Sequence, residues 1–169
     1  WSAVQPLDNV YGTMYRGIRA VNKFLIETDG QTFEEEKYNE DYPDQMQQFR
    51  LYPFEARFLR AFFYFELAKR YGSVPLITEP LAPDEANTVH AASFDSIVQF
   101  VVDECDFVAD SLPVTYLNLP NGETGRATKG AALALKSRAM LYAASPLHNE
   151  SSETQKCLAA AEAAHDIIY

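Results

Sequence analysis

The side chains that carry out most protein chemistry are few in this sequence and lie far apart. His90, His148 and His165 each stand alone, whereas a zinc site needs several ligands at close spacing, so we expect these histidines at surface or capping positions. The sequence contains no H-E-x-x-H zinc motif, no glycine-rich phosphate-binding loop and no G-x-S-x-G nucleophile motif. We therefore predict that the protein is not an enzyme and holds neither a metal nor a cofactor.

Acidic side chains are concentrated between residues 31 and 50. They are Glu34, Glu35, Glu36, Glu40, Asp41 and Asp44. Their carboxylate oxygens could bind calcium, but they lack the alternating spacing of an EF-hand loop. A solvated acidic loop is therefore the preferred interpretation of this segment.

Two arginines lie within the aromatic stretch FEARFLRAFFYFELAKRYGSVPL, which covers residues 54–76. On a helix of 3.6 residues per turn, Arg57 and Arg60 share a face that is flanked by packing residues, so we expect both to be half-buried. A buried guanidinium needs partners, and carboxylates of neighbouring helices or carbonyls at helix ends would serve. A structural clamp is preferred to contact with a ligand for both residues.

Aromatic side chains in the expected loops are the candidates for contact with a ligand. Trp1, the only tryptophan, and the loop tyrosines Tyr38, Tyr42 and Tyr116 could stack on a sugar or a peptide, or could simply pack against the protein. Packing is the preferred interpretation for Trp1. Trp1 and Tyr42 are nevertheless our candidates for ligand-side aromatics, and we expect Trp1→Ala to lower affinity while leaving the melting temperature unchanged.

Composition and charge exclude several classes of protein. The 169 residues are 47% hydrophobic, which argues against disorder, and a net charge of −10 argues against binding to nucleic acid. The longest uninterrupted apolar run, Ala139–Ala144, falls far short of the ~20 residues that a transmembrane helix needs. The chain opens on Trp1 rather than methionine, and we expect it to be a piece of a longer protein.

Apolar periodicity predicts an all-α fold of about five helices joined by long loops, with no convincing strand. The segment 31–50 is predicted to be a loop or a poorly packed excursion, and residues 71–77 a possible extended crossing segment. The expected helices cover residues 7–28, 54–71, 93–112, 128–144 and 154–169.

Small residues in the last two expected helices indicate close packing between helices. The spacing A-x-x-L-x-x-x-A-x-x-Y, from Ala132 to Tyr142, is similar to a tetratricopeptide helix, although the repeat period is irregular. Ser93 and Thr128 are expected to cap the third and fourth helices. We therefore predict degenerate tetratricopeptide-like helical hairpins.

The two cysteines, Cys105 and Cys157, do not lie at any motif spacing. Each falls in an expected helix, where a cysteine usually acts as a small buried hydrophobic residue. Two buried structural thiols are preferred to a disulfide.

Four motifs, in order along the chain, carry a resemblance to a known family. The first is Y-x-x-I-x-x-x-N, from Tyr15 to Asn22, and the second is E-A-R-F-L-R-A-x-x-Y-F-x-L-x-x-x-Y-G-x-V-P-L, from residue 55 to 76. The third, D-x-x-D-x-x-x-D-S-L-P, covers residues 103–113, and the fourth, G-R-A-T-K-G-A-A-x-A-L-K-x-R-x-x-L-Y, covers residues 125–142. Together they resemble the SusD/RagB family of outer-membrane nutrient-binding lipoproteins of Bacteroidetes-type bacteria.

The resemblance implies a non-catalytic binding protein at the cell surface. It would be anchored in the outer membrane by a lipidated N-terminus and would close over a SusC-like TonB-dependent transporter. Such proteins capture oligosaccharides, or peptides in the RagB branch, and pass them to the transporter. Family members are much longer, so residues 1–169 would be a single helical-repeat region that lacks the lipidated start and the C-terminal part. A helical-repeat scaffold for protein–protein interaction is the other function considered.

The residues that define these motifs have structural explanations rather than ligand-binding ones. Capping, helix ends and packing between helices account for all of them. They are Glu55, Arg57, Arg60, Gly72, Pro75, Gly125, Arg126 and Tyr142.

Overall fold

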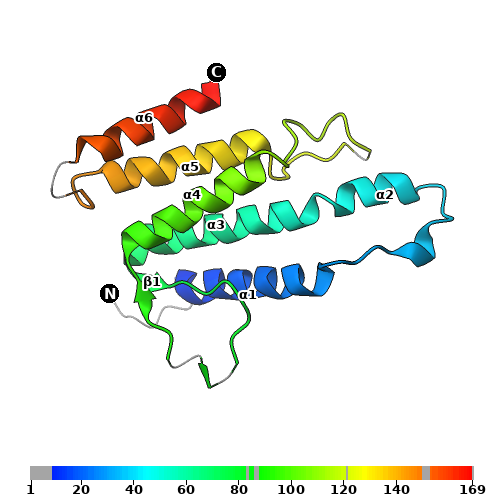
Figure 1. Ribbon diagram of the computed structural model, residues 1–169, viewed down its shortest axis with the longest axis horizontal. Helices are drawn as coiled ribbons and strands as arrows, with labels where there is room; N and C mark the ends of the chain where they lie inside the picture. The colour runs from blue at the N-terminus through cyan, green and yellow to red at the C-terminus, as the bar shows by residue number, and fades with distance from the viewer. Residues whose placement is uncertain (1–8, 83, 86–87, 121, 150–152, 169) are drawn as a thin grey trace.

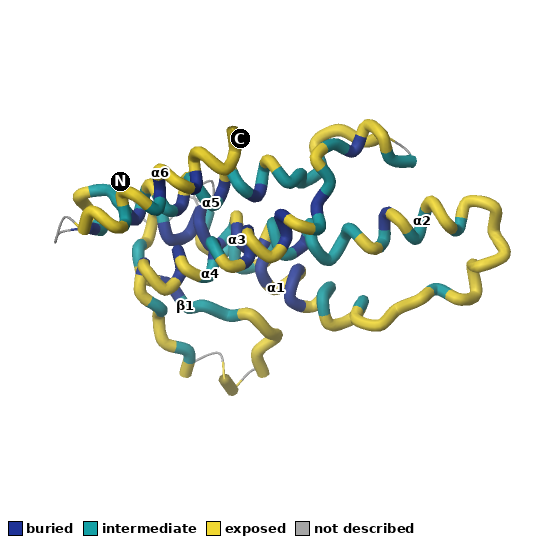
Figure 2. Tube along the Cα trace, turned by 45° about the horizontal axis from the view of Figure 1, so that its top comes forward, coloured by how far each residue is buried: buried dark blue, intermediate teal, exposed yellow. Residues whose placement is uncertain are grey.

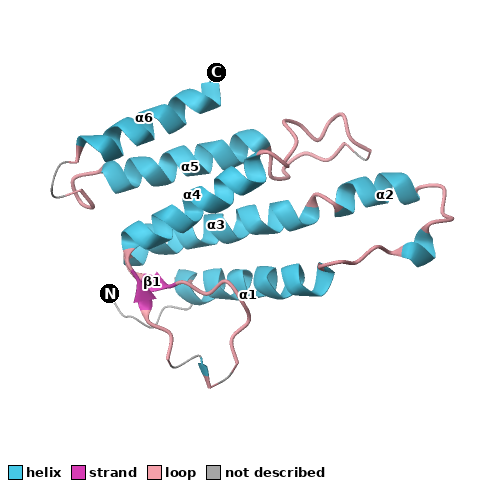
Figure 3. Cartoon of the chain, in the orientation of Figure 1, coloured by secondary structure: helices cyan, strands magenta, loops and turns pink. Residues whose placement is uncertain are grey.

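A computed structural model describes residues 9–82, 84–85, 88–120, 122–149 and 153–168 of the chain. Figure 3 shows that helices make up nearly all of the regular structure in this part. The helices are α1 (Val10–Thr28), α2 (Tyr42–Phe49), α3 (Tyr52–Tyr71), α4 (Phe94–Ala109), α5 (Lys129–Ala144) and α6 (Thr154–Ile168), with a 3₁₀ turn at Glu34–Glu36. The all-α prediction is confirmed, and the five long helices lie where the periodicity placed them.

The five long helices lie side by side in a single stack, in the order α1, α3, α4, α5, α6 (Figure 1). Each runs antiparallel to its neighbour, so α3 with α4 and α5 with α6 form two successive helical hairpins. Helix α5 contacts both α3 and α4, which joins the second hairpin to the first. This is the hairpin arrangement that the sequence predicted.

Polar side chains and a glycine define where the helices begin and end. The Ser93 hydroxyl accepts a hydrogen bond from the Ser96 amide at 3.1 Å, and the Thr128 hydroxyl accepts one from the Ala131 amide at 3.2 Å, as expected of N-caps. Gly72 ends α3 with a φ of 69°, a left-handed value that suits glycine. The predicted helix ends therefore follow from local chemistry.

The core lies where α3 meets α4 and α5, and the buried residues gather there in Figure 2. Its largest fully buried side chains include Tyr64, Phe65 and Leu67 of α3 and Ile97 and Val101 of α4. Alanines at positions 61 and 139 are completely buried, and their small size lets the helices approach closely. The aromatic stretch is therefore chiefly a core helix.

None of the described helices is both long enough and apolar enough to cross a membrane.

The segment 31–50 was predicted to be a loop, but its second half forms helix α2. The acidic composition of the segment made this short helix difficult to predict. Helix α2 has Pro43 in its first turn, a position where the missing N–H has no cost. The buried side chain of Gln48 donates a hydrogen bond to the Pro120 carbonyl at 2.8 Å and so ties α2 to the loop before α5. Helix α2 continues roughly along the line of α3 (Figure 1), with Pro53 at the start of α3.

The connector after α3 is extended, as the sequence suggested. Val74–Pro75 forms strand β1, which pairs with strand β2 (Ala91–Ala92) in an antiparallel two-stranded sheet. Tyr15 of α1 donates a hydrogen bond to the Pro75 carbonyl at 2.6 Å, and Tyr64 of α3 binds both the amide and the carbonyl of Ile77. The connector is thereby held against α1 and α3.

Candidate functional site

A buried carboxylate lies between the two arginines of the aromatic helix. Glu104 of α4 accepts hydrogen bonds from Arg57 at 2.6 and 3.2 Å and from Arg60 at 3.0 Å. Arg60 also donates to the Asn22 side-chain oxygen at 2.8 Å and to the Thr78 carbonyl at 3.1 Å. The two guanidinium groups thus have the kinds of partner that were expected for them, a carboxylate of a neighbouring helix and a backbone carbonyl.

This cluster links four parts of the chain: α1, α3, α4 and the connector. Only 5% of Glu104 and 6% of Arg60 are exposed, so neither is accessible to a ligand, and the expectation that Arg60 is half-buried is wrong because the carboxylate of α4 lets it be fully buried. Arg57 is less buried, and its guanidinium stacks 3.9 Å from the centre of the Phe107 ring. The geometry is that of a structural clamp. Glu104 is the member that the sequence prediction missed, and its signal is an acidic residue on the apolar face of helix 93–112.

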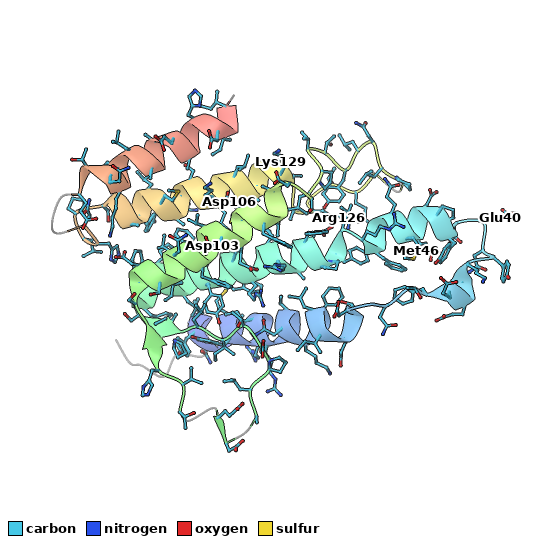
Figure 4. All side chains as sticks on the ribbon, viewed as in Figure 1. Glu40, Met46, Asp103, Asp106, Arg126 and Lys129 are labelled. Carbon is cyan, nitrogen blue, oxygen red and sulfur yellow. The ribbon has the colours of Figure 1, made fainter. Side chains whose placement is uncertain are left out.

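A second charged cluster fixes the start of α3 to the loop before α5. Arg126, labelled in Figure 4, pairs with Glu55 through two hydrogen bonds and lies between the rings of Tyr52 and Tyr116. The Tyr116 hydroxyl donates to Glu55 at 2.8 Å. Burial raises the pKa of Tyr116, and this hydrogen bond raises it further. Because Tyr116 is only 4% exposed, it packs within the protein rather than offering a surface to a ligand.

The remaining motif residues lie at turns and packing contacts. Gly125 has a φ of 89°, which favours glycine, and Pro75 belongs to strand β1. The Tyr142 ring contacts Phe65 edge-on with 5.3 Å between ring centres, and so joins α5 to α3. These positions form no common site.

Of the two residues that the sequence predicted to contact a ligand, the structure describes one. Trp1 lies outside the described residues. Tyr42 begins α2 and is half-buried, and its hydroxyl donates to the Thr32 carbonyl at 2.9 Å. Tyr42 therefore holds the segment after α1 against α2. Tyr38, which was open to the same two interpretations, is 88% exposed.

An aromatic-lined cavity of about 390 Å³ lies beside this contact, between the end of α1, helix α2 and the start of α3. Phe33 and Phe49 lie with their ring centres 5.0 Å apart, and Tyr52 lies 5.6 Å from Phe49. Met46 of α2, labelled in Figure 4, and Phe24 of α1 complete the apolar part of the wall. The sequence did not predict this cavity, because it depends on how the chain after α1 turns back to place α2 and the start of α3 beside the end of α1.

Two unpaired polar side chains also line this aromatic cavity. Arg50 and Gln31 are exposed, and within the part of the chain that the structure describes their side chains make no hydrogen bond or ion pair. Phe33, whose ring forms part of the cavity wall, has a φ of 49°, a left-handed value that is uncommon for a residue other than glycine. The cavity thus combines aromatic rings that are tilted against one another with free planar hydrogen-bonding groups.

This combination suits a ligand with both an apolar face and hydroxyl groups. Binding sites are typically concave and mostly apolar, with a few polar groups that fix the orientation of the ligand. No group of three or more metal-ligating side chains occurs among the described residues. The acidic side chains of residues 34–44 are thus not gathered into a group of this kind.

The two cysteines differ in their burial. Cys105 is fully buried, and burial raises the pKa of its thiol to about 12. The expectation of a second buried thiol is wrong, because Cys157 is exposed on α6, and both cysteines are free.

Comparison with known families gives a match that covers most of the chain. Residues 1–141 match a SusD-like family model described as starch-binding and associating with the outer membrane. A SusD-like protein of Formosa agariphila is 30% identical over 84 residues, which is 50% of this chain and 15% of the relative.

Solved structures give the same result for the fold. A SusD-like carbohydrate-binding protein of Bacteroides fragilis superposes with a TM-score of 0.72 and 31% identity, over 96% of this chain and 27% of that protein. A laminarin-binding SusD-like protein superposes with a TM-score of 0.65 and 27% identity, over 85% of this chain and 27% of that protein. The chain thus spans about a quarter of the length of these solved relatives.

Proposed function

Because this chain belongs to the SusD-like family, we propose that its protein captures oligosaccharides at the outer membrane for import through a SusC-like TonB-dependent transporter. The capture is non-catalytic, and the ligand leaves unchanged. The protein lies on the cell surface, held by a lipidated N-terminus outside the 169 residues, which form a single helical-repeat region. The observation that carries this proposal is the match of 96% of the chain to a SusD-like carbohydrate-binding protein at 31% identity.

The aromatic cavity at the α1–α2–α3 junction is the site that we propose for sugar contact within this chain. The rings of Phe33, Phe49 and Tyr52 offer apolar surface to the C–H face of a sugar ring. The free side chains of Arg50 and Gln31 can donate hydrogen bonds to its hydroxyl groups. Tyr42 holds the segment that carries Gln31 and Phe33 through its hydrogen bond to the Thr32 carbonyl.

Arg50→Ala tests this site. We expect about tenfold weaker binding of the oligosaccharide, or ~1.4 kcal/mol, because a hydrogen bond to a charged group contributes about 1.5–3 kcal/mol. The melting temperature should stay unchanged, since exposed side chains without partners contribute little to stability. Isothermal titration of the full-length polypeptide would measure the affinity. Arg16→Ala, on the N-terminal half of α1, is the matched control, and equal affinities for all three proteins would place the sugar site elsewhere.

Trp1→Ala tests the other candidate for ligand contact. We expect weaker oligosaccharide binding with an unchanged melting temperature, because a stacked indole contributes to the complex and not to the helical core. An affinity equal to that of the unaltered protein would remove Trp1 from the site.

Two alternative functions predict different binding partners. A RagB-like member would bind peptides in place of oligosaccharides, and a helical-repeat scaffold would bind a protein partner with no small ligand.

Purifying the full-length protein from detergent-solubilised membranes tests the transporter partnership, and we expect a large β-barrel protein to co-purify. Recovery of soluble intracellular proteins alone would favour the scaffold and contradict the proposal.

A further inference from the structure

An unpaired arginine borders the aromatic cavity at the α1–α2–α3 junction. Arg50 lies where α2 ends and α3 follows, and its exposed guanidinium makes no hydrogen bond or ion pair with any described residue. Four other arginines each bind a carboxylate within the protein, and these are Arg57, Arg60, Arg70 and Arg126. The charge and the donor groups of Arg50 are therefore available to a bound molecule.

No acidic side chain offsets this charge within the cavity. Its described lining consists of Arg50 together with aromatic, aliphatic and uncharged polar residues, and contains neither Asp nor Glu. The whole chain has 24 Asp and Glu against 14 Lys and Arg. By comparison, the cavity between α1 and the connector is lined by Arg19 and also by Glu79. The aromatic cavity is thus locally cationic in an acidic protein.

The acidic 3₁₀ turn Glu34–Glu36 lies next to the cavity in sequence, but its side chains do not line it. The first and last of its carboxylates have partners within the protein, an ion pair with Lys37 at 3.7 Å and a hydrogen bond from Asn39. The energy between two charges falls with distance, and salt screens it further. A ligand group in direct contact with Arg50 is therefore affected more by this guanidinium than by the acidic surface outside the cavity.

The aromatic wall beside Arg50 contains an unfavourable backbone conformation. Phe33 is the one residue other than glycine with a positive φ among those that the structure describes. Its ring nevertheless lies in the cavity wall, 5.0 Å from the ring centre of Phe49. Unfavourable conformations of this kind are concentrated at ligand-binding and active sites. This conformation supports the view that the cavity is a binding site and not an incidental gap in the packing.

We propose that the aromatic cavity takes an acidic sugar, a unit of the oligosaccharide that carries a carboxylate or a sulfate ester, and that Arg50 binds this oxyanion. This ligand class rests on the proposed capture of oligosaccharides and specifies which kind is captured. The planar guanidinium offers paired N–H groups that match the oxygens of a carboxylate. The C–H face of the sugar lies on Phe33 and Phe49, and Gln31 donates a hydrogen bond to one of its hydroxyl groups.

Charged glycans and their neutral forms test the proposal on the full-length polypeptide. Isothermal titration would compare neutral, uronate-containing and sulfated oligosaccharides. Each acidic binder would be titrated again after methyl esterification of its carboxylates or removal of its sulfate groups. We expect the tightest binder to be acidic and its neutral form to bind about tenfold more weakly, because hydrogen bonds between ionised partners are roughly twice as strong as neutral ones. The treatment that lowers affinity identifies the oxyanion as carboxylate or sulfate.

Arg50→Gln tests whether this preference arises in the cavity. Glutamine keeps a planar donor but removes the charge, so the preference for the acidic form should fall to about twofold or less. Arg16→Gln is the matched control, because it removes the same charge from an exposed position on α1 outside this cavity. The control should keep the full preference, and the melting temperatures of both variants would show that they are folded.

Three results would overturn this ligand class and leave the capture of oligosaccharides intact. They are binding of neutral glycans alone, equal affinity for the acidic and neutral forms, and a preference that survives Arg50→Gln. Failure to bind any oligosaccharide would contradict the proposed function itself, and the acidic ligand with it.

Discussion

Replacing Glu104 by alanine is expected to lower the free energy of unfolding by about 3–5 kcal/mol, the usual cost of removing one partner from a buried ion pair. Glu104 is the carboxylate shared by Arg57 and Arg60, and both contacts are 3.0 Å or shorter. Without it, the buried Arg60 guanidinium would keep, among the described residues, hydrogen bonds to the Asn22 side chain and the Thr78 carbonyl and no carboxylate. The loss would loosen α4 from α3, and urea unfolding followed by circular dichroism would measure it.

Asp103→Ala is the matched control for this change. Asp103 precedes Glu104 on the same helix but is exposed, and within the described part of the chain its carboxylate accepts a hydrogen bond only from Gln99, one turn earlier in α4. We expect a change within about 0.5 kcal/mol for this surface position. If Glu104→Ala and Asp103→Ala had equally small effects, the cluster would not be a structural clamp.

Replacing Phe65 by alanine is expected to cost about 3–5 kcal/mol of stability, the range for truncating a buried phenylalanine. Phe65 is 1% exposed and contacts the Tyr142 ring edge-on, so it connects the aromatic motif of α3 to the small-residue motif of α5. The change would leave a cavity at the junction of the two hairpins. Thermal and urea unfolding should both report the loss.

Phe62→Ala separates this packing effect from a general effect of losing an aromatic side chain. Phe62 lies on the same helix and is 37% exposed. We expect its loss to cost well under half as much, because little apolar area is returned to water. Equal destabilisation by the two changes would contradict the assignment of Phe65 to the inter-hairpin contact.

The long helices and their ends could be predicted from the sequence because their causes are local. Ser93 and Thr128 each satisfy an amide three residues further on, and Gly72 adopts a backbone conformation that other residues avoid. The apolar spacing of α4 places Ile97 and Val101 in the core without any knowledge of the partner helix. Such features depend on residues within one or two helical turns.

The rest of the structure depends on contacts between segments far apart in the sequence. Arg60 and Glu104 are separated by 44 positions, so the need for a partner could be inferred but the partner could not be identified. Helix α2 has an acidic sequence and is held by Gln48, which binds a carbonyl 72 positions away. Cys157 falls on α6, which packs chiefly against α5, so its helical position did not imply burial.

The Glu55–Arg126 cluster and Gln48 also explain how a scaffold could present the proposed sugar site. The Glu55–Arg126 pair and the stacked Tyr52 ring fix the start of α3, and Tyr52 is itself part of the aromatic cavity. Gln48 holds α2 from the other side. The cavity wall is therefore set by buried interactions that a ligand need not supply, which lowers the entropy lost on binding.

The most direct test of the account is to titrate the full-length polypeptide with separate panels of oligosaccharides and peptides, and to analyse any bound ligand by mass spectrometry. We expect saturable binding of an oligosaccharide that is recovered with its mass unchanged, and weaker binding by the Arg50→Ala variant. Binding of peptides but no oligosaccharide, or recovery of a shortened glycan, would contradict it.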